Sequence, residues 1–199
     1  PPLKFLQEKI LCRGGGLVGD VIWKKNGQLS KRKGGGRMKP VTYRPISEIY
    51  ADGFRKIWTD PDVIQYTNIE KPCTPEEIRE KIHALERFHV FAVLRGDEVI
   101  GVVGCLRISP AKDEYGFFYQ FQKSVWGKGY ASHAAAWMLG WMRGRYQHSV
   151  ILADVITENA ASEKILRHFG FQCVSEKQTV HKGKQATLRS YMLEYQDTP

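Results

Sequence analysis

Trp126-Gly127-Lys128-Gly129-Tyr130-Ala131 is the most informative segment of the sequence. It lies between a run typical of a β-strand and a run typical of a helix. Its two glycines allow backbone N–H groups to approach an anion closely, and the positive end of the helix dipole favours negative charge at this point. An ordinary tight turn between a strand and a helix has the same appearance. The two interpretations, a phosphate site and a plain turn, can therefore be distinguished only by the flanking residues.

The two commonest nucleotide-binding motifs do not account for this stretch. A dinucleotide-binding G-x-G-x-x-G pattern needs a third glycine where Ser132 stands. A P-loop needs Gly-Lys-Ser or Gly-Lys-Thr after a long glycine loop, and the sequence contains no such run. The sequence thus argues against both the Rossmann class and the P-loop class.

Outward from this stretch, strand and helix patterns alternate along the chain. The expected strands are residues 41–44, 90–94, 99–108, 115–121, 150–156, 171–176 and 186–195. Two helices are expected at 129–146 and 160–169, and a turn at 182–184. Hairpins come first and a β-α-β-α unit comes later. This order predicts an α+β fold, in which helices pack on a mixed sheet.

Two further helices are expected before the first long hairpin. The first has Ser47 as its N-cap and an apolar face made of Ile49, Phe54, Ile57 and Trp58. The second begins with Thr74-Pro75-Glu76-Glu77. There a capping hydroxyl, a proline at the first helical position and two acids in the first turn all favour a helix start.

Length and composition limit the class of protein. A chain of 199 residues with 42% hydrophobic residues predicts one principal domain with one sizeable core. No apolar run approaches the ~20 residues that span a bilayer, and no secretory-signal pattern opens the chain. The cysteines lie far apart and are expected to be free thiols. We therefore expect a cytoplasmic protein with no membrane partner. The four cysteines of the chain are Cys12, Cys73, Cys105 and Cys173.

The positive charge of the chain is concentrated in its first 37 residues. That leader holds nine of the 30 Lys and Arg residues but only two of the 21 acidic residues. Residues 38–199 are nearly balanced, with 21 basic and 19 acidic residues. A nearly neutral domain lacks the basic surface that nucleic acid requires, so no nucleic-acid partner is expected for it.

The leader has two interpretations. Its glycine runs at 14–16 and 34–36 and its few apolar residues predict poor order. A basic arm that binds nucleic acid is one interpretation. The preferred one is that residues 1–37 are not native, because residues 32–37 resemble a translated ribosome-binding site directly before Met38. The domain is accordingly assigned to residues 38–199.

The residues around the opening stretch resemble one enzyme family. Glu114-Tyr115-Gly116-Phe117-Phe118 precedes it, and Asn159-Ala160-Ala161-Ser162 and Phe169-Gly170-Phe171 follow it. With Val41-Thr42-Tyr43-Arg44-Pro45 upstream, these motifs resemble the GNAT superfamily of N-acetyltransferases. The most similar branch is that of the ribosomal-protein N-terminal acetyltransferases. The resemblance covers about residues 41–195 and departs from the family at Ser124 and His133.

The resemblance implies a fold, a cosubstrate and a reaction. The implied fold is a twisted sheet of about seven strands, mixed but mostly antiparallel, flanked by helices. Acetyl-CoA is the implied cosubstrate, and no metal is implied. An acetyl group is expected to pass to a primary amine, on a protein N-terminus or a small molecule, by direct attack in a ternary complex. The residues implied to bind acetyl-CoA are Phe121, Gln122, Trp126, Gly127, Lys128, Gly129, Tyr130, Ala131 and Asn159.

The same resemblance suggests three catalytic candidates. Glu114 is the first candidate for the base, on the strand before the cofactor loop; a surface glutamate in a hairpin is the alternative. His181 is the second, because an ordinary histidine pKa suits proton transfer near neutrality; a solvated turn histidine is the alternative. Ser162 is the candidate proton donor, since Leu166 stands where many family members have a tyrosine acid.

Several alternatives stay open. A non-catalytic module of the same fold that binds or senses acyl-CoA is the main rival, because a fold does not determine a function. On the acceptor side, Trp58, Tyr66 and His181 are compatible with peptide N-termini, polyamines, aminoglycosides or amino acids. The chain is expected to be a monomer or a homodimer.

Overall fold

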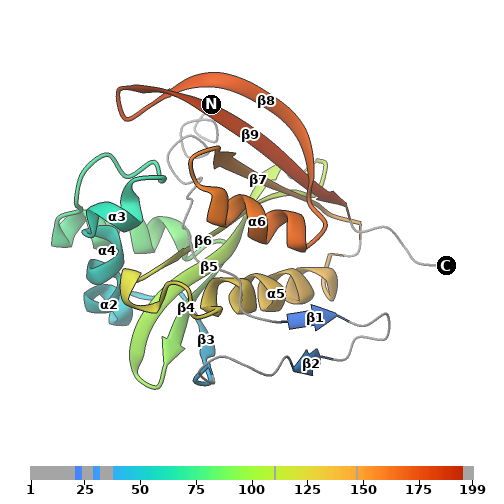
Figure 1. The fold of residues 1–199 in the computed structure, drawn as a ribbon. Helices are drawn as coiled ribbons and strands as arrows, with labels where there is room; N and C mark the ends of the chain where they lie inside the picture. The colour runs from blue at the N-terminus through green and yellow to red at the C-terminus, as the bar shows by residue number, and fades with distance from the viewer. Residues whose placement is uncertain (1–20, 24–28, 32–37, 110, 147, 195–199) are drawn as a thin grey trace.

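The computed structural model describes residues 21–23, 29–31, 38–109, 111–146 and 148–194. At its centre is a seven-stranded sheet with helices on both faces (Figure 1). In the leader, β1 (Val21–Trp23) pairs antiparallel with β2 (Leu29–Lys31) as a separate small sheet. The other predictions made for residues 1–37, poor order included, lie outside the described residues.

The strands of the main sheet run in the order β3-β4-β5-β6-β7-β9-β8. All neighbours are antiparallel except β6 and β7, which are parallel. The predicted α+β fold, with its mostly antiparallel sheet flanked by helices, is therefore confirmed. The strands are β3 (Thr42–Pro45), β4 (His89–Arg95), β5 (Glu98–Ser109), β6 (Glu114–Phe121), β7 (Val150–Ile156), β8 (Gln172–His181) and β9 (Lys184–Glu194).

The helices begin close to their predicted positions, with one exception. Thr74 and Glu77 form the predicted reciprocal cap of α4, each side chain accepting from the other's backbone N–H. The helix expected from Ser47 is divided into a 3-10 turn and α2. Because a 3-10 turn does not keep the 3.6-residue period, Ile49 is 80% exposed instead of lying on the apolar face. The helices are η1 (Glu48–Tyr50), α2 (Ala51–Trp58), α3 (Pro61–Ile64), α4 (Pro75–Leu85), η2 (Lys123–Val125), α5 (Tyr130–Arg143) and α6 (Ala160–His168).

Two hydrophobic clusters cover the two faces of the sheet. Tyr115, Phe117, Tyr119 and Phe121 of β6 belong to the cluster that includes α5 and α6. Phe118 belongs to the cluster that includes α2 and α4. Since successive side chains of a strand point to opposite faces, odd-numbered residues of β6 face α5 and α6, and even-numbered residues face α2 and α4.

The parallel strands β6 and β7 pair only near their beginnings. Their Cα partners run from Glu114↔Val150 to Gly116↔Leu152, although β6 continues to Phe121 and β7 continues to Ile156. On their other sides, β5 and β9 stay paired over most of the same length. The strands therefore separate beyond Gly116 and Leu152. We call this opening the fork.

The hairpin of β8 and β9 is longer than predicted, and its tip reaches toward α3 (Figure 1). The strand expected at 171–176 continues to His181. Residues 177–181 are mostly polar, so they lack the hydrophobic alternation that marks a strand, yet they pair with β9. At the tip, Lys182 Nζ donates to the carbonyl oxygens of Ile64 at 2.8 Å and Ile69 at 2.6 Å. The tip thereby contacts the end of α3 and the segment that follows it.

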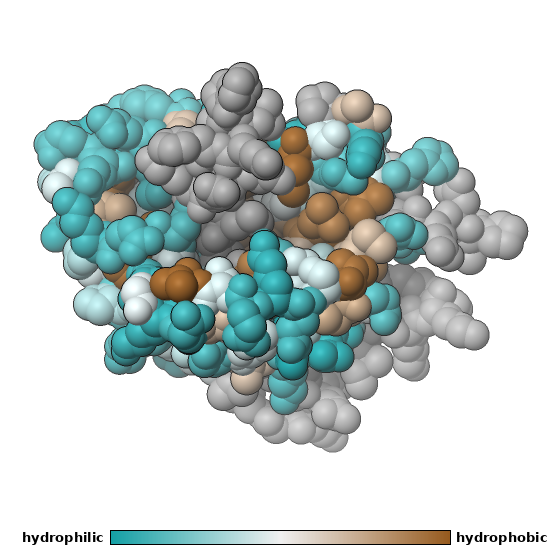
Figure 2. Space-filling model, turned by 90° about the horizontal axis from the view of Figure 1, so that it is seen from above, coloured by the Kyte–Doolittle hydropathy of each residue, from teal (hydrophilic) through white to brown (hydrophobic). Residues whose placement is uncertain are grey.

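The surface seen from above is mostly hydrophilic, with small separate hydrophobic patches (Figure 2). Within the described ranges, no helix has both the length and the apolar character needed to cross a membrane.

Candidate functional site

The opening stretch forms the turn between β6 and α5. Gly127 and Gly129 have φ angles of 72° and 82°, a left-handed conformation that glycine adopts without steric penalty. The first backbone bond of α5 runs from the His133 N–H to the Gly129 carbonyl. The N–H groups of residues 130–132 therefore have no acceptor within the helix. This turn is suited to hold an anion.

Side chains from the end of β6 hold the turn in place. The Trp126 indole Nε1 donates to the Phe121 carbonyl at 2.9 Å. Gln122 Nε2 donates to the Val99 carbonyl at 2.5 Å, and Gln122 Oε1 accepts from Ser124 Oγ at 3.2 Å. Gln122 is buried, and so is the Phe121 ring. Of the residues predicted to bind a cofactor, Gln122 and Trp126 thus hold the turn with their side chains, and Phe121 does so with its backbone carbonyl.

Two exposed lysines border the turn. Lys128 Nζ donates to the Ser124 carbonyl at 2.7 Å. Lys123 forms an ion pair with Asp62, which follows the start of α3. The Asp62 carboxylate raises the pKa of Lys123, first through their hydrogen bond. The Lys123 ammonium group therefore stays positive near neutrality.

Ser132 is a site residue that the sequence analysis missed. It lies in the first turn of α5, is 2% exposed, and its hydroxyl has no hydrogen-bond partner among the described residues. A buried hydroxyl without a partner costs about 1–3 kcal/mol, so a ligand oxygen at this point would satisfy it. Its place three residues after Gly129 was the available signal, because that is the first turn of the predicted helix.

A second polar group lies at the beginning of α6. Asn159 caps this helix, its Oδ1 accepting from the Ser162 N–H at 3.2 Å. The Ser162 hydroxyl lies 3.0 Å from the hydroxyl of Tyr119 on β6. Asn159 Nδ2 is buried and has no partner among the described residues. The structure thus brings Asn159 and Ser162 together, with Tyr119 as a third member that the sequence analysis did not single out.

The Tyr119 phenol is kept neutral by its surroundings. Burial raises its pKa well above the ordinary tyrosine value, and the hydrogen bond with Ser162 offsets part of that rise. A neutral phenol can donate a hydrogen bond but is a poor acid. Tyr119 is thus suited to orient the Ser162 hydroxyl.

The site fits a long ligand that carries phosphate at one end and amide groups along an arm. The turn offers free amides and the Ser132 hydroxyl for phosphate oxygens. The β7-facing edge of β6 from 117 to 121 takes no part in the β6–β7 ladder, so it can pair with an extended arm as a strand would. Asn159 Nδ2 adds a buried donor beside it. These features fit coenzyme A.

The opposite face of the fork carries different polar groups. Gln120 is 1% exposed and its Oε1 accepts from Trp58 Nε1 of α2 at 2.6 Å. Gln120 Nε2 has no partner among the described residues. On β7, Asp154 accepts a hydrogen bond from Ser190 of β9 at 2.7 Å. Asp154 and Gln120 lie beyond the point where the strands separate.

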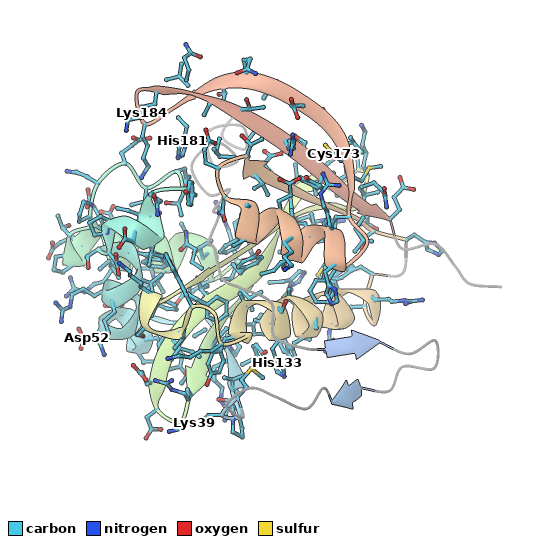
Figure 3. All side chains as sticks on the ribbon, in the orientation of Figure 1. Lys39, Asp52, His133, Cys173, His181 and Lys184 are labelled. Carbon is cyan, nitrogen blue, oxygen red and sulfur yellow. The ribbon has the colours of Figure 1, made fainter. Side chains whose placement is uncertain are left out.

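The other two catalytic candidates lie apart from the turn. Glu114 begins β6, on the same face as Phe118, and sits where β6 and β7 are still paired. His181 ends β8 at the hairpin tip, near Lys184 (Figure 3). Its Nε2 lies 2.7 Å from the Gln65 carbonyl, so the ring donates a hydrogen bond there. The roles predicted for Glu114 and His181 stay predictions.

Cys73, Cys105 and Cys173 are free thiols, and Cys12 lies outside the described residues. In the part of the chain that the structure describes, no group of three His, Cys, Asp or Glu side chains is placed to hold a metal ion.

Comparison with known proteins places this geometry among acetyltransferases. Residues 41–172 match the family described as acetyltransferase (GNAT) domain. The uncharacterized N-acetyltransferase p20 of Bacillus licheniformis is 28% identical over 161 residues, which cover 76% of this chain and 90% of that protein.

Two solved structures share the fold. The ribosomal-protein-S5-alanine acetyltransferase of Vibrio fischeri superposes with a TM-score of 0.69 at 18% identity, covering 82% of this chain and 98% of that one. An acetyltransferase of Salmonella typhimurium, solved with acetyl-CoA, superposes with a TM-score of 0.67 at 14% identity, covering 81% and 97%. At these identities the likeness concerns the fold.

Proposed function

Because the chain belongs to the GNAT family of acetyltransferases, we propose that it moves an acetyl group from acetyl-CoA to a primary amine. The amine attacks directly in a ternary complex. One observation carries the proposal: a glycine turn with free helix amides lies at the open end of the fork between β6 and β7. We assign this activity to residues 38–199.

The turn is the proposed site of the phosphate groups. The N–H groups of residues 130–132, the Ser132 hydroxyl and the positive end of α5 all favour phosphate oxygens. Gly127 and Gly129 let the backbone come close. Lys128 contributes positive charge, and Tyr130 and Ala131 contribute their amides.

The fork is the proposed site of the arm that ends in the thioester. Anchored at the turn, an extended arm runs along the free edge of β6 toward Gly116 and Leu152, where the strands close. Its acyl end then lies nearest to that closing point. Asn159 Nδ2 supplies a donor from the α6 side. The acceptor amine enters from the face of α2 and α4, under the β8–β9 tip.

The chemistry requires a neutral amine, a polarised carbonyl and a partner for the departing thiolate. Acetyl-CoA supplies the thioester. Backbone N–H groups of β6 at the fork polarise the carbonyl. The Ser162 hydroxyl, held by Tyr119 at 3.0 Å, stabilises the thiolate. Glu114 and His181 stay proposed as acceptor-side acid or base groups.

The nature of the acceptor is a finer proposal. The family motifs around Trp126 and Asn159 are most similar to those of enzymes that acetylate ribosomal-protein N-termini, so we propose peptide N-termini as the first class of acceptor to test. Small-molecule amines follow. Gln120 Nε2, buried and without a partner among the described residues, is available to an acceptor oxygen.

The proposal is tested by following free thiol released from acetyl-CoA with a panel of amines. Turnover on at least one amine is expected. Tight binding of acetyl-CoA without turnover on any amine would instead favour the sensing module.

A glycine substitution tests the phosphate site separately. Gly129→Asp places a carboxylate in the turn, and it should weaken acetyl-CoA binding by roughly 100-fold or more, or about 2.7 kcal/mol. Gly170→Asp is the matched control, since Gly170 follows the C-terminal end of α6, has a φ of 85°, and a Cβ atom there would meet only Leu193 at 3.9 Å. Titration calorimetry measures both affinities. An unchanged Kd for Gly129→Asp would rule out the assigned turn.

A further inference from the structure

Asp154 occupies a special position on β7. The last pair of the β6–β7 ladder is Gly116↔Leu152. Asp154 follows Leu152 by two residues, so it lies just beyond the last β6–β7 pair, where the strands have separated. Continuing the parallel register places it opposite Phe118 of β6, across the gap. This is where the acyl end of the arm is placed by the proposed function, on which the following inference rests.

The side chain of Asp154 faces the acceptor side. Ile151, Ala153 and Val155 of β7 belong to the cluster with α5 and α6. By the alternation of a strand, Asp154 points to the opposite face, from which the amine enters. It is half-buried, so a carboxylate there is partly shielded from water while it stays within reach of a ligand.

A hydrogen bond orients this carboxylate. Ser190 lies directly opposite Asp154 in the β7–β9 ladder, and its Oγ donates to Asp154 Oδ1 at 2.7 Å. The short distance suits a bond to a charged acceptor. The backbone positions of both residues are set by a regular antiparallel ladder, so the carboxylate is held on a rigid element.

We propose that Asp154 is the base that takes the proton of the acceptor amine, and that Ser190 is its positioning residue. As the nitrogen lone pair forms the new N–C bond, the C–S bond breaks and its electron pair leaves with sulfur. Before this attack, one proton of the acceptor's ammonium form passes to the Asp154 carboxylate, directly or through one water, and the second nitrogen proton leaves to solvent as the amide forms. The thiolate leaves beside Ser162 and takes its proton from solvent.

Few other titratable groups share this face. Glu114 of β6 and Glu194 of β9 both lie at the level of Val150, four positions from Asp154, or about 13 Å at the usual strand rise. On the outer strand β8, Ser175 pairs with Ser190, and Lys177 follows Ser175 by two residues. Of these three carboxylates, only Asp154 lies beyond the last β6–β7 pair, where the strands have separated.

The test replaces Asp154 by its uncharged isostere in the full chain. Asp154→Asn should lower kcat by roughly 100-fold to 10,000-fold, the usual contribution of a positioned base, and leave the Kd of acetyl-CoA unchanged. The loss should shrink as the pH approaches the pKa of the acceptor amine, because a neutral amine needs no base before attack. A purely structural defect would not follow the amine's pKa.

Two further variants keep the result decisive. Ser190→Ala should lower kcat by roughly tenfold, the value of one hydrogen bond to a charged group, with the fold intact by circular dichroism. Asp97→Asn, in the exposed β4–β5 turn, is the matched control and should keep the wild-type rate.

The outcomes separate this inference from the proposed function. If the wild type turns over no amine, the proposed function fails. If the wild type is active and Asp154→Asn keeps its kcat, Asp154 is not the base. A large loss in Glu114→Gln together with an active Asp154→Asn would transfer the role to Glu114.

Discussion

At the scale of single residues, the glycines around the turn have distinct functions. Gly127 and Gly129 supply backbone conformations, whereas Gly101 supplies space. A Cβ atom on Gly101 would lie 2.4 Å from Cδ1 of the Phe121 ring and 2.9 Å from the Gln120 carbonyl. Gly101 therefore lets β5 and β6 pack with the Phe121 ring between them, directly before the turn.

This close approach predicts the effect of one added methyl group. Gly101→Ala should destabilise the fold by about 1–3 kcal/mol, the usual cost of overpacking, because the ring or the strand has to move. Urea denaturation measures the change in the free energy of unfolding. The displaced Phe121 should also weaken acetyl-CoA binding.

Gly140 is the matched control for that variant. It lies inside α5, and a Cβ there meets nothing within 4 Å. Gly140→Ala should therefore stabilise the fold by about 0.5–1 kcal/mol, since alanine favours a helix over glycine. Equal effects of the two substitutions would contradict the packing assigned to Gly101.

At the scale of elements, the site depends on how β6, β7 and the β8–β9 hairpin are joined. The fork exists because β7 leaves β6 after three paired residues and follows β9. The hairpin then crosses to the other layer, where Lys182 and His181 donate to carbonyl oxygens of the segment after α3. The proposed acceptor side thus lies between segments that are distant in sequence.

Loosening the hairpin tip should therefore affect the acceptor more than acetyl-CoA. Lys182→Ala removes two hydrogen bonds and leaves the carbonyls of Ile64 and Ile69 without that partner. We expect a several-fold rise in KM for the amine, an unchanged Kd for acetyl-CoA, and faster hydrogen exchange at 64–69 and 178–185.

Lys184 provides the control in the same turn. It is exposed (Figure 3), so Lys184→Ala should leave KM and exchange as in the wild type. If the two lysine variants behave alike, the tip does not shape the acceptor side.

At the scale of the whole molecule, stability should depend on pH through two half-buried histidines, His89 and His133. Burial is the main cause that lowers the pKa of His133 and of His89, and Arg145 and Arg107 add to the effect at His89. His133 Nδ1 lies 2.7 Å from the Tyr43 hydroxyl, and His89 Nε2 lies 2.8 Å from the Tyr146 hydroxyl. Both rings pack between α5 and the early strands.

The sign of this dependence follows from proton linkage. A folded-state pKa below the unfolded value means that the unfolded chain binds protons first as the pH falls. The free energy of unfolding should thus be highest above about pH 7 and fall as the pH drops below about 6.5, the ordinary histidine pKa. Urea titrations between pH 5 and 8 measure it.

Removing the titrating rings should flatten that curve. His133→Gln and His89→Gln should each reduce stability at neutral pH but lose less of it between pH 7 and 5 than the wild type does. A slope that both substitutions leave unchanged would assign the pH dependence to other groups.

Much of the fold follows from local sequence patterns. Residues 150–156 match β7, and the start of α4 follows from Thr74-Pro75-Glu76-Glu77. The helix at 129–146 was too long by a few residues at its end, because Arg143 and Gly144 do not interrupt the pattern as strongly as a proline would. The polar half of β8 was missed, since edge strands exposed on both faces carry no hydrophobic alternation.

Local sequence was enough to predict the α+β class, the glycine turn at Trp126 to Ala131 and the start of α4 at Thr74, because these depend on residues close together in the chain. The identity of the groups around the fork, by contrast, depends on tertiary packing. Whether Asp154 meets Ser190, Tyr119 meets Ser162 or Gln120 meets Trp58 depends on strand register and on which face each side chain takes. Those are set by packing between segments 36 to 62 residues apart.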